Sequence, residues 1–240
     1  MPVPTALAVD LGSRSAGVWA SQRGTVSGPC GDADAPVRRG RVVDVDGCVT
    51  LLTGLVRRYP EPVPPGGVVV ACRPVLAAPA DEQAARRVLD AVFAPARVVF
   101  VDTVRAAAIG SGAAAGSLLV VDAGAELTEV ALLLDGRVTA ARRTDIGTRD
   151  LTRGATTGLL ADTVVRHLDE LRAGPERPEV LSALARGPLL VGDGALQPDL
   201  APALSRALRG PVHRAAAPRT AALTGAGLAA MSLLRHPARA

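Results

Sequence analysis

Residues 119–131 read LVVDAGAELTEVA, and this stretch indicates the fold more strongly than any other part of the chain. An apolar run ends in Asp122-Ala123-Gly124, and a second apolar run follows after a few residues. Residues 6–13, ALAVDLGS, end in the same way at Asp10-Leu11-Gly12, and residues 17–20 can form a returning strand. Each pattern predicts a strand, a tight turn and a second strand. The two patterns lie about a hundred residues apart, which indicates a weak internal duplication in a two-lobed α/β protein.

The remaining periodicity fits this class of fold. Apolar runs and helical spacing alternate along the chain, and Gly- and Pro-rich breaks separate them. Residues 24–40 are rich in Gly, Pro and Asp and predict a loop. We expect a first lobe over residues 1–110 and a second over 111–240. Strands are predicted at 68–72, 98–101, 117–121, 128–134, 137–143, 189–191 and 212–213, and helices at 49–59, 80–93, 104–110, 157–172, 181–186, 199–208 and 220–233.

Composition excludes several classes of protein. Hydrophobic residues make up 48% of the 240 residues and aromatic residues only 2%, so Ala, Val and Leu must fill the core. The net charge of +4 is spread over scattered Arg pairs without a basic stripe or a known motif, which argues against nucleic acid as a partner. Three widely spaced cysteines offer no metal site or catalytic signature. Without a leader-like N-terminus or an apolar run of about 18 residues, we expect a cytoplasmic protein with no transmembrane segment, at most peripheral to the inner face of the membrane.

The two Asp-x-Gly turns are suited to binding a phosphate. Glycine lets the backbone approach a phosphate closely, and the N–H groups of a turn can cradle it. If the two hairpins face each other across one cleft, Asp10 and Asp122 can hold Mg²⁺ through water, which is the habit of that reluctantly dehydrated ion. Both acids could instead be ordinary turn residues.

At this point the sequence resembles the actin, heat-shock-chaperone and sugar-kinase superfamily, and within it the bacterial cell-shape proteins of the MreB family. Residues 8–13 look like the first phosphate loop, and residues 119–131 like the second, whose family form is VVDIGGGTTEVA. Residues 101–110, VDTVRAAAIG, are similar to the connecting segment EEPMAAAIG, and residues 190–196, LVGDGAL, to the adenosine loop LTGGGAL. The four motifs stand in the family's order and cover most of the chain.

The resemblance implies a two-lobed actin-like (ribonuclease H-like) ATPase fold and a site for ATP or ADP with Mg²⁺. The candidate nucleotide-binding residues are Asp10, Gly12, Ser13, Ser15, Asp122, Gly124, Gly192 and Gly194, with Asp10 and Asp122 as the metal-holding acids. The serines could also be plain turn hydroxyls, and the last two glycines could serve only a strand-to-helix turn. The stretches where the family carries its small subdomains are short here, so we expect the core subdomains only.

Several positions depart from the family pattern. The acid that helps to place the attacking water is replaced by Thr103; Asp102, one residue earlier, is the only catalytic candidate, and the shift should point it elsewhere. Glu126 and Leu127 replace a glycine and a threonine of the second phosphate loop, and Asp193 replaces the middle glycine of the adenosine loop. An inward-facing Glu126 would repel phosphate unless Mg²⁺ or an Arg compensated it, and we interpret Glu126 and Asp193 as solvated loop acids.

Three functions are compatible with these residues. The first is an MreB-like protein of cell-shape and cell-wall morphogenesis that binds ATP weakly, hydrolyses little or none and acts through protein partners. The second is an active ATPase or phosphotransferase of the same superfamily, and the third is a nucleotide-free scaffold. We favour the first, a weak or inactive ATPase. Because the family's small second-lobe subdomain supplies much of the filament contact, we expect a monomer or small oligomer and no long filaments.

Overall fold

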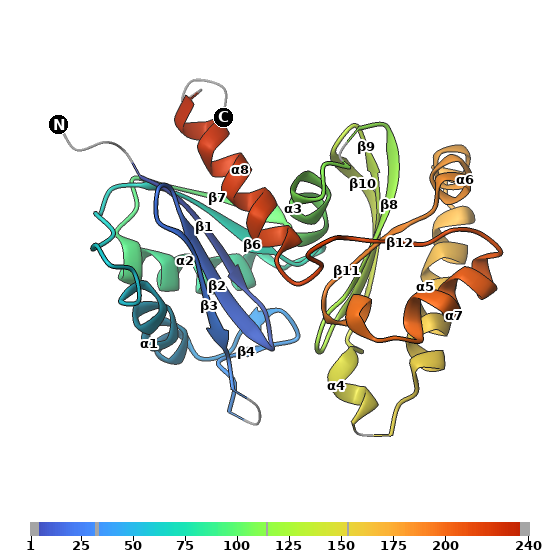
Figure 1. Cartoon of the computed structure of the whole chain (residues 1–240), viewed down its shortest axis with the longest axis horizontal. Helices are drawn as coiled ribbons and strands as arrows, with labels where there is room; N and C mark the ends of the chain where they lie inside the picture. The colour runs from blue at the N-terminus through green and yellow to red at the C-terminus, as the bar shows by residue number, and fades with distance from the viewer. Residues whose placement is uncertain (1–4, 32–33, 114, 153, 236–240) are drawn as a thin grey trace. The chain divides into compact units, whose positions relative to one another are not determined.

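The computed structural model describes residues 5–31, 34–113, 115–152 and 154–235, and the chain divides into two compact units. The first unit comprises Met1–Arg73, Ala77–Val101 and Leu223–Ala240, and the second comprises Pro74–Leu76 and Asp102–Ala222. Each unit contains its own five-stranded sheet (Figure 1). The units differ from a simple division at residue 110 in three places. Residues 74–76 and residues 102–110 group with the second unit, and the C-terminal helix groups with the first from Leu223 on.

The sheet of the first unit has the strand order β3-β2-β1-β6-β7. Strands β1 and β2 are antiparallel, as are β2 and β3, whereas β1 and β6 are parallel. The Asp10-x-Gly12 turn therefore joins two neighbouring strands at the centre of the sheet. The strands are β1 (Ala6–Leu11), β2 (Ser15–Ala20), β3 (Gly24–Pro29), β6 (Val68–Arg73) and β7 (Arg97–Asp102).

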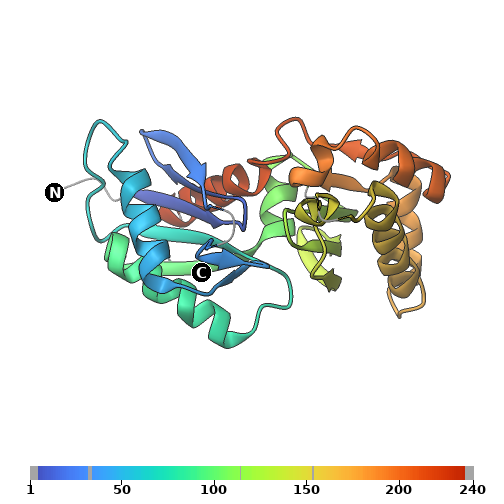
Figure 2. The same ribbon diagram turned by 90° about the horizontal axis from the view of Figure 1, so that it is seen from below.

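Helices cover both faces of this sheet (Figure 2). Alternate side chains of β2 point to opposite faces. Val18 belongs to the cluster formed with α1 (Val45–Val56) and α2 (Pro79–Phe93). Trp19 lies on the other face, against Gly227 of α8 (Ala221–Arg235), where an added Cβ would approach the indole ring to 3.0 Å. A glycine thus lets α8 pack closely on the large aromatic ring.

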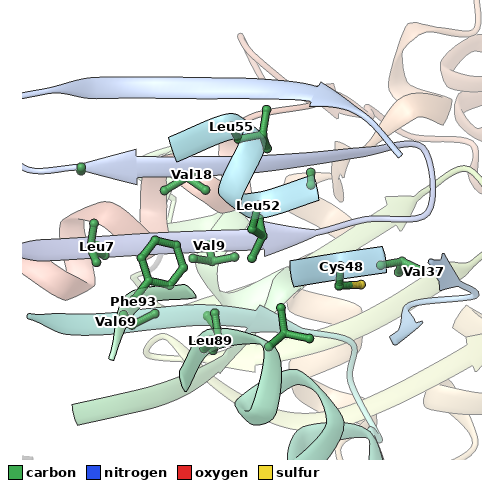
Figure 3. Packing of buried hydrophobic residues seen from close by; sticks show 14 of the residues in the cluster. Leu7, Val9, Val18, Val37, Cys48, Leu52, Leu55, Val69, Leu89 and Phe93 are labelled. Carbon is green, nitrogen blue, oxygen red and sulfur yellow. The ribbon is translucent and has the colours of Figure 1, made fainter. Parts of the chain in front are cut away.

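The core of the first unit is mostly aliphatic, as the composition requires, with Cys30, Cys48, Tyr59 and Phe93 among its other members (Figure 3). Leu7 and Val9 of β1 meet Leu52 of α1 and Leu89 of α2, and each of these four side chains is at most 1% exposed. Burying a leucine or valine side chain contributes about 1.5–3 kcal/mol, so this cluster stabilises the strand that carries Asp10.

The second unit repeats the arrangement with the order β10-β9-β8-β11-β12. Its first strand, β8 (Ser117–Ala123), is antiparallel to β9 (Thr128–Leu134) and parallel to β11 (Leu189–Val191), as β1 is to β2 and β6. The duplication expected from the two Asp-x-Gly turns is confirmed by this topology. The remaining elements are α3 (Thr103–Gly110), β10 (Arg137–Thr144), α5 (Thr157–Arg172), α6 (Arg177–Arg186), α7 (Leu200–Leu208) and β12 (His213–Arg214).

The expectation of a loop over residues 24–40 was wrong for its two ends. Residues 24–29 form β3, the edge strand, and residues 37–42 form a hairpin of β4 (Val37–Arg38) and β5 (Arg41–Val42). Four of the six residues of β3 are exposed. An edge strand has one unpaired side and tolerates the polar residues, glycine and proline that suggested a loop.

The stretches where the family carries its small subdomains are short. Within the described residues, the chain between β3 and α1 forms only the β4–β5 hairpin, and between β10 and α5 only the one-turn helix α4 (Thr148–Leu151). The prediction of a fold reduced to its core subdomains is confirmed. None of the helices in the described ranges combines the length and the apolar character that crossing a bilayer would require.

Candidate functional site

The first Asp-x-Gly turn is closed by its own backbone and held by a neighbouring hairpin. Gly12 donates its N–H to the carbonyl oxygen of Ser15 at 3.1 Å, which forms the tight turn between β1 and β2. Ser13 is buried, and its Oγ accepts a hydrogen bond from the N–H of Gly40 at 3.4 Å, whereas Ser15 is exposed. The Ser13 hydroxyl therefore ties the β4–β5 hairpin to the turn, and that of Ser15 faces solvent.

Asp10 lies near the end of β1, opposite Gly17 of β2. Burial raises the pKa of Asp10 to about 6, because removal of water disfavours the charged carboxylate. A cation placed beside such a group would favour the ionised form and lower the pKa again. The first turn thus presents a carboxyl group whose charge depends on what is bound near it.

In the second unit, the structure brings together two of the motifs named in the sequence. Strand β11 pairs in parallel with β8, so Val191 lies opposite Asp122 and Gly192 follows directly beside the carboxylate. A Cβ on Gly192 would collide with Asp122 Oδ1 and lie 2.7 Å from the carbonyl oxygen of Ala123. Gly194, in the 3₁₀ helix η1 (Asp193–Leu196), packs in the same way on Ala123. The structure therefore brings Asp122, Gly192 and Gly194 next to one another at the ends of β8 and β11.

The β8–β9 turn is fixed by α4 and the residue before it. Gly124 donates its N–H to the carbonyl oxygen of Leu127 at 2.8 Å. The N–H groups of Thr148 and Arg149 donate to the carbonyl oxygens of Gly124 and Ala125 at 3.0 and 2.8 Å. Gly147 packs so tightly on Ala125 that a Cβ has no room there. The turn is therefore held in one conformation by backbone hydrogen bonds.

The interpretation of Glu126 and Asp193 as solvated loop acids was wrong. Glu126 Oε1 lies 2.9 Å from Arg149 Nη1, and these side chains are only 16% and 12% exposed. Asp193 is 9% exposed and forms an ion pair with Arg219 at 2.5 Å. Spacing along the sequence could not reveal these pairs, because the partners are 23 and 26 residues apart. Both acids that replace glycines are thus compensated by arginines of the same unit.

Glu129 is a site residue that the sequence reasoning missed. It is 2% exposed and pairs in register with Asp122 on β8 and with Arg143 on β10. Its Oε1 accepts a hydrogen bond from the N–H of Val75 at 2.6 Å. Burial, with Asp122 as the next cause, raises the pKa of Glu129 well above its ordinary value. An acid inside the apolar run of residues 128–134 was the signal that could have identified it.

Asp102, the catalytic candidate, is the N-cap residue of α3, and its side chain makes no capping hydrogen bond. Its charge contributes to the raised pKa of Glu129, which places it in the same electrostatic environment. In the part of the chain that the structure describes, no three His, Cys, Asp or Glu side chains form a group able to hold a metal ion. A magnesium ion would therefore depend on water and on the ligand's phosphates for most of its coordination.

Solved structures with the same fold exist. The chain is similar to MreB5 of Spiroplasma citri, solved with AMPPNP and with ADP, with TM-scores of 0.83 and 0.81, 13% identity and coverage of 99% of both chains. The ethanolamine utilization protein EutJ of Carboxydothermus hydrogenoformans matches with a TM-score of 0.66 and 19% identity, over 95% of this chain and 90% of EutJ. A chain of the PilM–PilN type IV pilus biogenesis complex matches with a TM-score of 0.65 and 15% identity. That match covers 95% of this chain and 99% of the other. No protein-family model and no curated protein sequence matches the chain.

These likenesses agree with the topology of the two sheets. The chain has the actin-like ATPase fold, as the four sequence motifs led us to expect. At sequence identities of 13–19%, these likenesses show the fold alone. The activity must be argued from the residues of this chain.

Proposed function

We propose that this chain is an actin-like protein of cell-shape or cell-wall morphogenesis that binds a magnesium nucleotide weakly and acts through protein partners. The observation that carries the proposal is the meeting of Asp122 with Gly192 and Gly194 beside a rigid Asp-x-Gly turn, together with a second such turn at Asp10 in the other unit. The binding of AMPPNP and ADP by MreB5 supports a nucleotide as the ligand.

In this proposal each Asp-x-Gly turn is a phosphate-binding loop of its own unit. Gly12, Ser13 and Ser15 belong to the first phosphate loop, Asp122 and Gly124 to the second, and Gly192 and Gly194 to the adenosine side. Asp10 and Asp122 are the acids of the two turns proposed to contact magnesium through water, since neither unit offers a cluster of acids within the described residues. With a pKa raised by burial to about 6, Asp10 is already mostly ionised at pH 7, and a nearby magnesium ion would favour the ionised form further.

Hydrolysis is expected to be slight or absent. Stabilising the transition state requires a positioned water and donors around the γ-phosphate. Thr103 stands where the family has its water-placing acid, and Leu127 stands where it has a threonine. We expect phosphate release at or below the uncatalysed background, with partial recovery in the triple variant Thr103→Glu, Glu126→Gly, Leu127→Thr. Turnover by the purified wild-type chain would instead support an active ATPase or phosphotransferase.

A nucleotide-free scaffold is the second candidate, and the two ion pairs favour it. Arg149 and Arg219 already have carboxylate partners in Glu126 and Asp193, so the second unit neutralises its own loops without a ligand. The PilM–PilN complex is a case in which a protein of this fold assembles with a protein partner. Both candidates therefore have the chain acting through partners, and they differ in whether nucleotide binds.

Calorimetric titration separates the two candidates. The wild-type chain is titrated with MgATP, MgADP and magnesium AMPPNP, beside the variants Asp122→Asn and Asp169→Asn. Asp169 pairs with Arg172 at 2.9 Å on the exposed side of α5, so its variant makes the same charge change outside the two Asp-x-Gly turns. We expect dissociation constants of roughly 10–1,000 μM, weakened by Asp122→Asn and not by Asp169→Asn. Absence of heat for all three nucleotides would favour the scaffold.

A further inference from the structure

The pairing of Glu126 with Arg149 lies in the middle of the second Asp-x-Gly turn. Glu126 is two residues beyond Gly124, and its carboxylate reaches the guanidinium of Arg149 at 2.9 Å. Both side chains are largely buried, so solvent screens the pair less than it screens the exposed Asp169–Arg172 pair. A strong acid–base contact therefore exists on the loop that resembles a phosphate cradle.

The backbone, and not Glu126, brings Arg149 to this loop. The N–H of Arg149 donates to the carbonyl oxygen of Ala125, and the N–H of Thr148 donates to that of Gly124. Gly147 lies against the backbone of Ala125 and Glu126 with no room for a side chain. Loss of the Glu126 charge would leave these backbone contacts in place, so Arg149 would stay beside the turn.

We propose that Glu126 is an internal anion that occupies Arg149 and restrains the binding of nucleotide phosphates at this loop. The proposal rests on the proposed function, because it assumes that the ligand is a nucleoside di- or triphosphate. A phosphate that approaches the turn must either displace the Glu126 carboxylate from Arg149 or bind next to it. Displacement breaks a charge-assisted hydrogen bond, and binding next to it places two anions together.

In this arrangement Arg149 can bind a phosphate only when Glu126 no longer pairs with it. Arginine recognises carboxylate and phosphate by the same planar set of donors, so one anion can replace the other without movement of the backbone. Whatever neutralises or withdraws Glu126, such as a basic segment of a protein partner, would release Arg149 to the ligand. Weak nucleotide binding is then a property of one residue and not of a decayed site.

The test compares Glu126→Gln with Glu126→Gln/Arg149→Gln and with the charge-matched control Asp169→Asn. Glutamine keeps the size of the side chain and a hydrogen bond to Arg149. Each chain is titrated calorimetrically with MgADP, magnesium AMPPNP and inorganic pyrophosphate, after circular dichroism has shown that it is folded. We expect Glu126→Gln to lower the dissociation constants by about tenfold or more, which is the effect of removing one close like charge. The double variant should lose this gain, and Asp169→Asn should match the wild type.

The outcomes separate this proposal from the proposed function. If the wild type binds nucleotide and Glu126→Gln binds it no better, the proposed function stands and the restraint by Glu126 is refuted. If only Glu126→Gln binds, the restraint is supported, and the wild-type chain by itself is not a nucleotide-binding protein. If the double variant keeps the full gain, Arg149 is not the residue released. If no chain binds nucleotide or pyrophosphate, both proposals are wrong.

Discussion

Replacing Gly192 with alanine perturbs the point at which two motifs of the second unit meet. Gly192 has φ = 80° and ψ = −172°, a conformation that is almost restricted to glycine and costs another residue on the order of 1–3 kcal/mol. The added Cβ would also collide with Asp122 Oδ1 and press on the carbonyl of Ala123. Overpacking of this kind costs about 1–3 kcal/mol, because part of the obstacle is backbone that cannot rotate away.

Together these effects are expected to lower the free energy of unfolding by about 3 kcal/mol. With an m value of roughly 2 kcal/mol per M, the midpoint of urea unfolding should fall by about 1.5 M. Far-UV circular dichroism follows the transition, and an unchanged slope would show that the variant unfolds to a similar state.

Gly158→Ala is the matched control for this experiment. Gly158 lies in the first turn of α5 in the same unit, and its added Cβ would make only an ordinary contact with Thr156 Oγ1 at 3.4 Å. Alanine is favoured over glycine in a helix by up to about 1 kcal/mol, so this variant should be neutral or slightly more stable. If Gly192→Ala unfolded at the same urea concentration as the wild type or a higher one, the described packing of Gly192 on Asp122 would be wrong.

Three further predictions concern pH and assembly. Burial lowers the pKa of His167, whose Nε2 lies 2.7 Å from Thr144 Oγ1, so the unfolded chain binds the proton more tightly. The contribution of His167 to the free energy of unfolding should therefore fall as pH drops below about 6.5. A His167→Gln variant should lack this contribution, so the difference in stability between it and the wild type should change with pH; equal slopes would contradict the assignment. Burial raises the pKa of Asp10 to about 6, so its contribution to stability is lost as pH rises from about 4 to 6. Asp10→Asn should then be more stable than the wild type at pH 7 without magnesium or nucleotide, by up to about 3 kcal/mol in the free energy of unfolding. Urea unfolding measures the difference, and an unchanged midpoint would mean that Asp10 is not desolvated. Sedimentation and negative-stain microscopy at tens of micromolar with MgATP should show a monomer or small oligomer, because a specific interface buries upwards of about 1,000 Å² of surface. Long ordered filaments would show that the core subdomains alone supply the filament contact.

Local patterns predicted most of the fold. The Asp-x-Gly turns at residues 10–12 and 122–124 require a strand on each side, and the helical spacing of residues 80–93 and 157–172 required helices there. The edge strand β3 escaped prediction, because the half-exposed strand of a sheet edge has the composition of a loop. The hydrophobic repeats of a strand, every two residues, and of a helix, every 3.6 residues, depend on neighbouring residues in the sequence. They can therefore be recognised without knowing which strands pair.

The sequence by itself determined which residues could form the two loops and which positions depart from the family pattern. Only the tertiary structure decided what those departures do. Glu126 and Asp193 each find an arginine more than twenty residues away, and Glu129 joins Asp122 and Arg143 in one row across three strands. The charge and the pKa of a side chain depend on the groups folded around it in space, and chain folding brings those groups together from distant parts of the sequence.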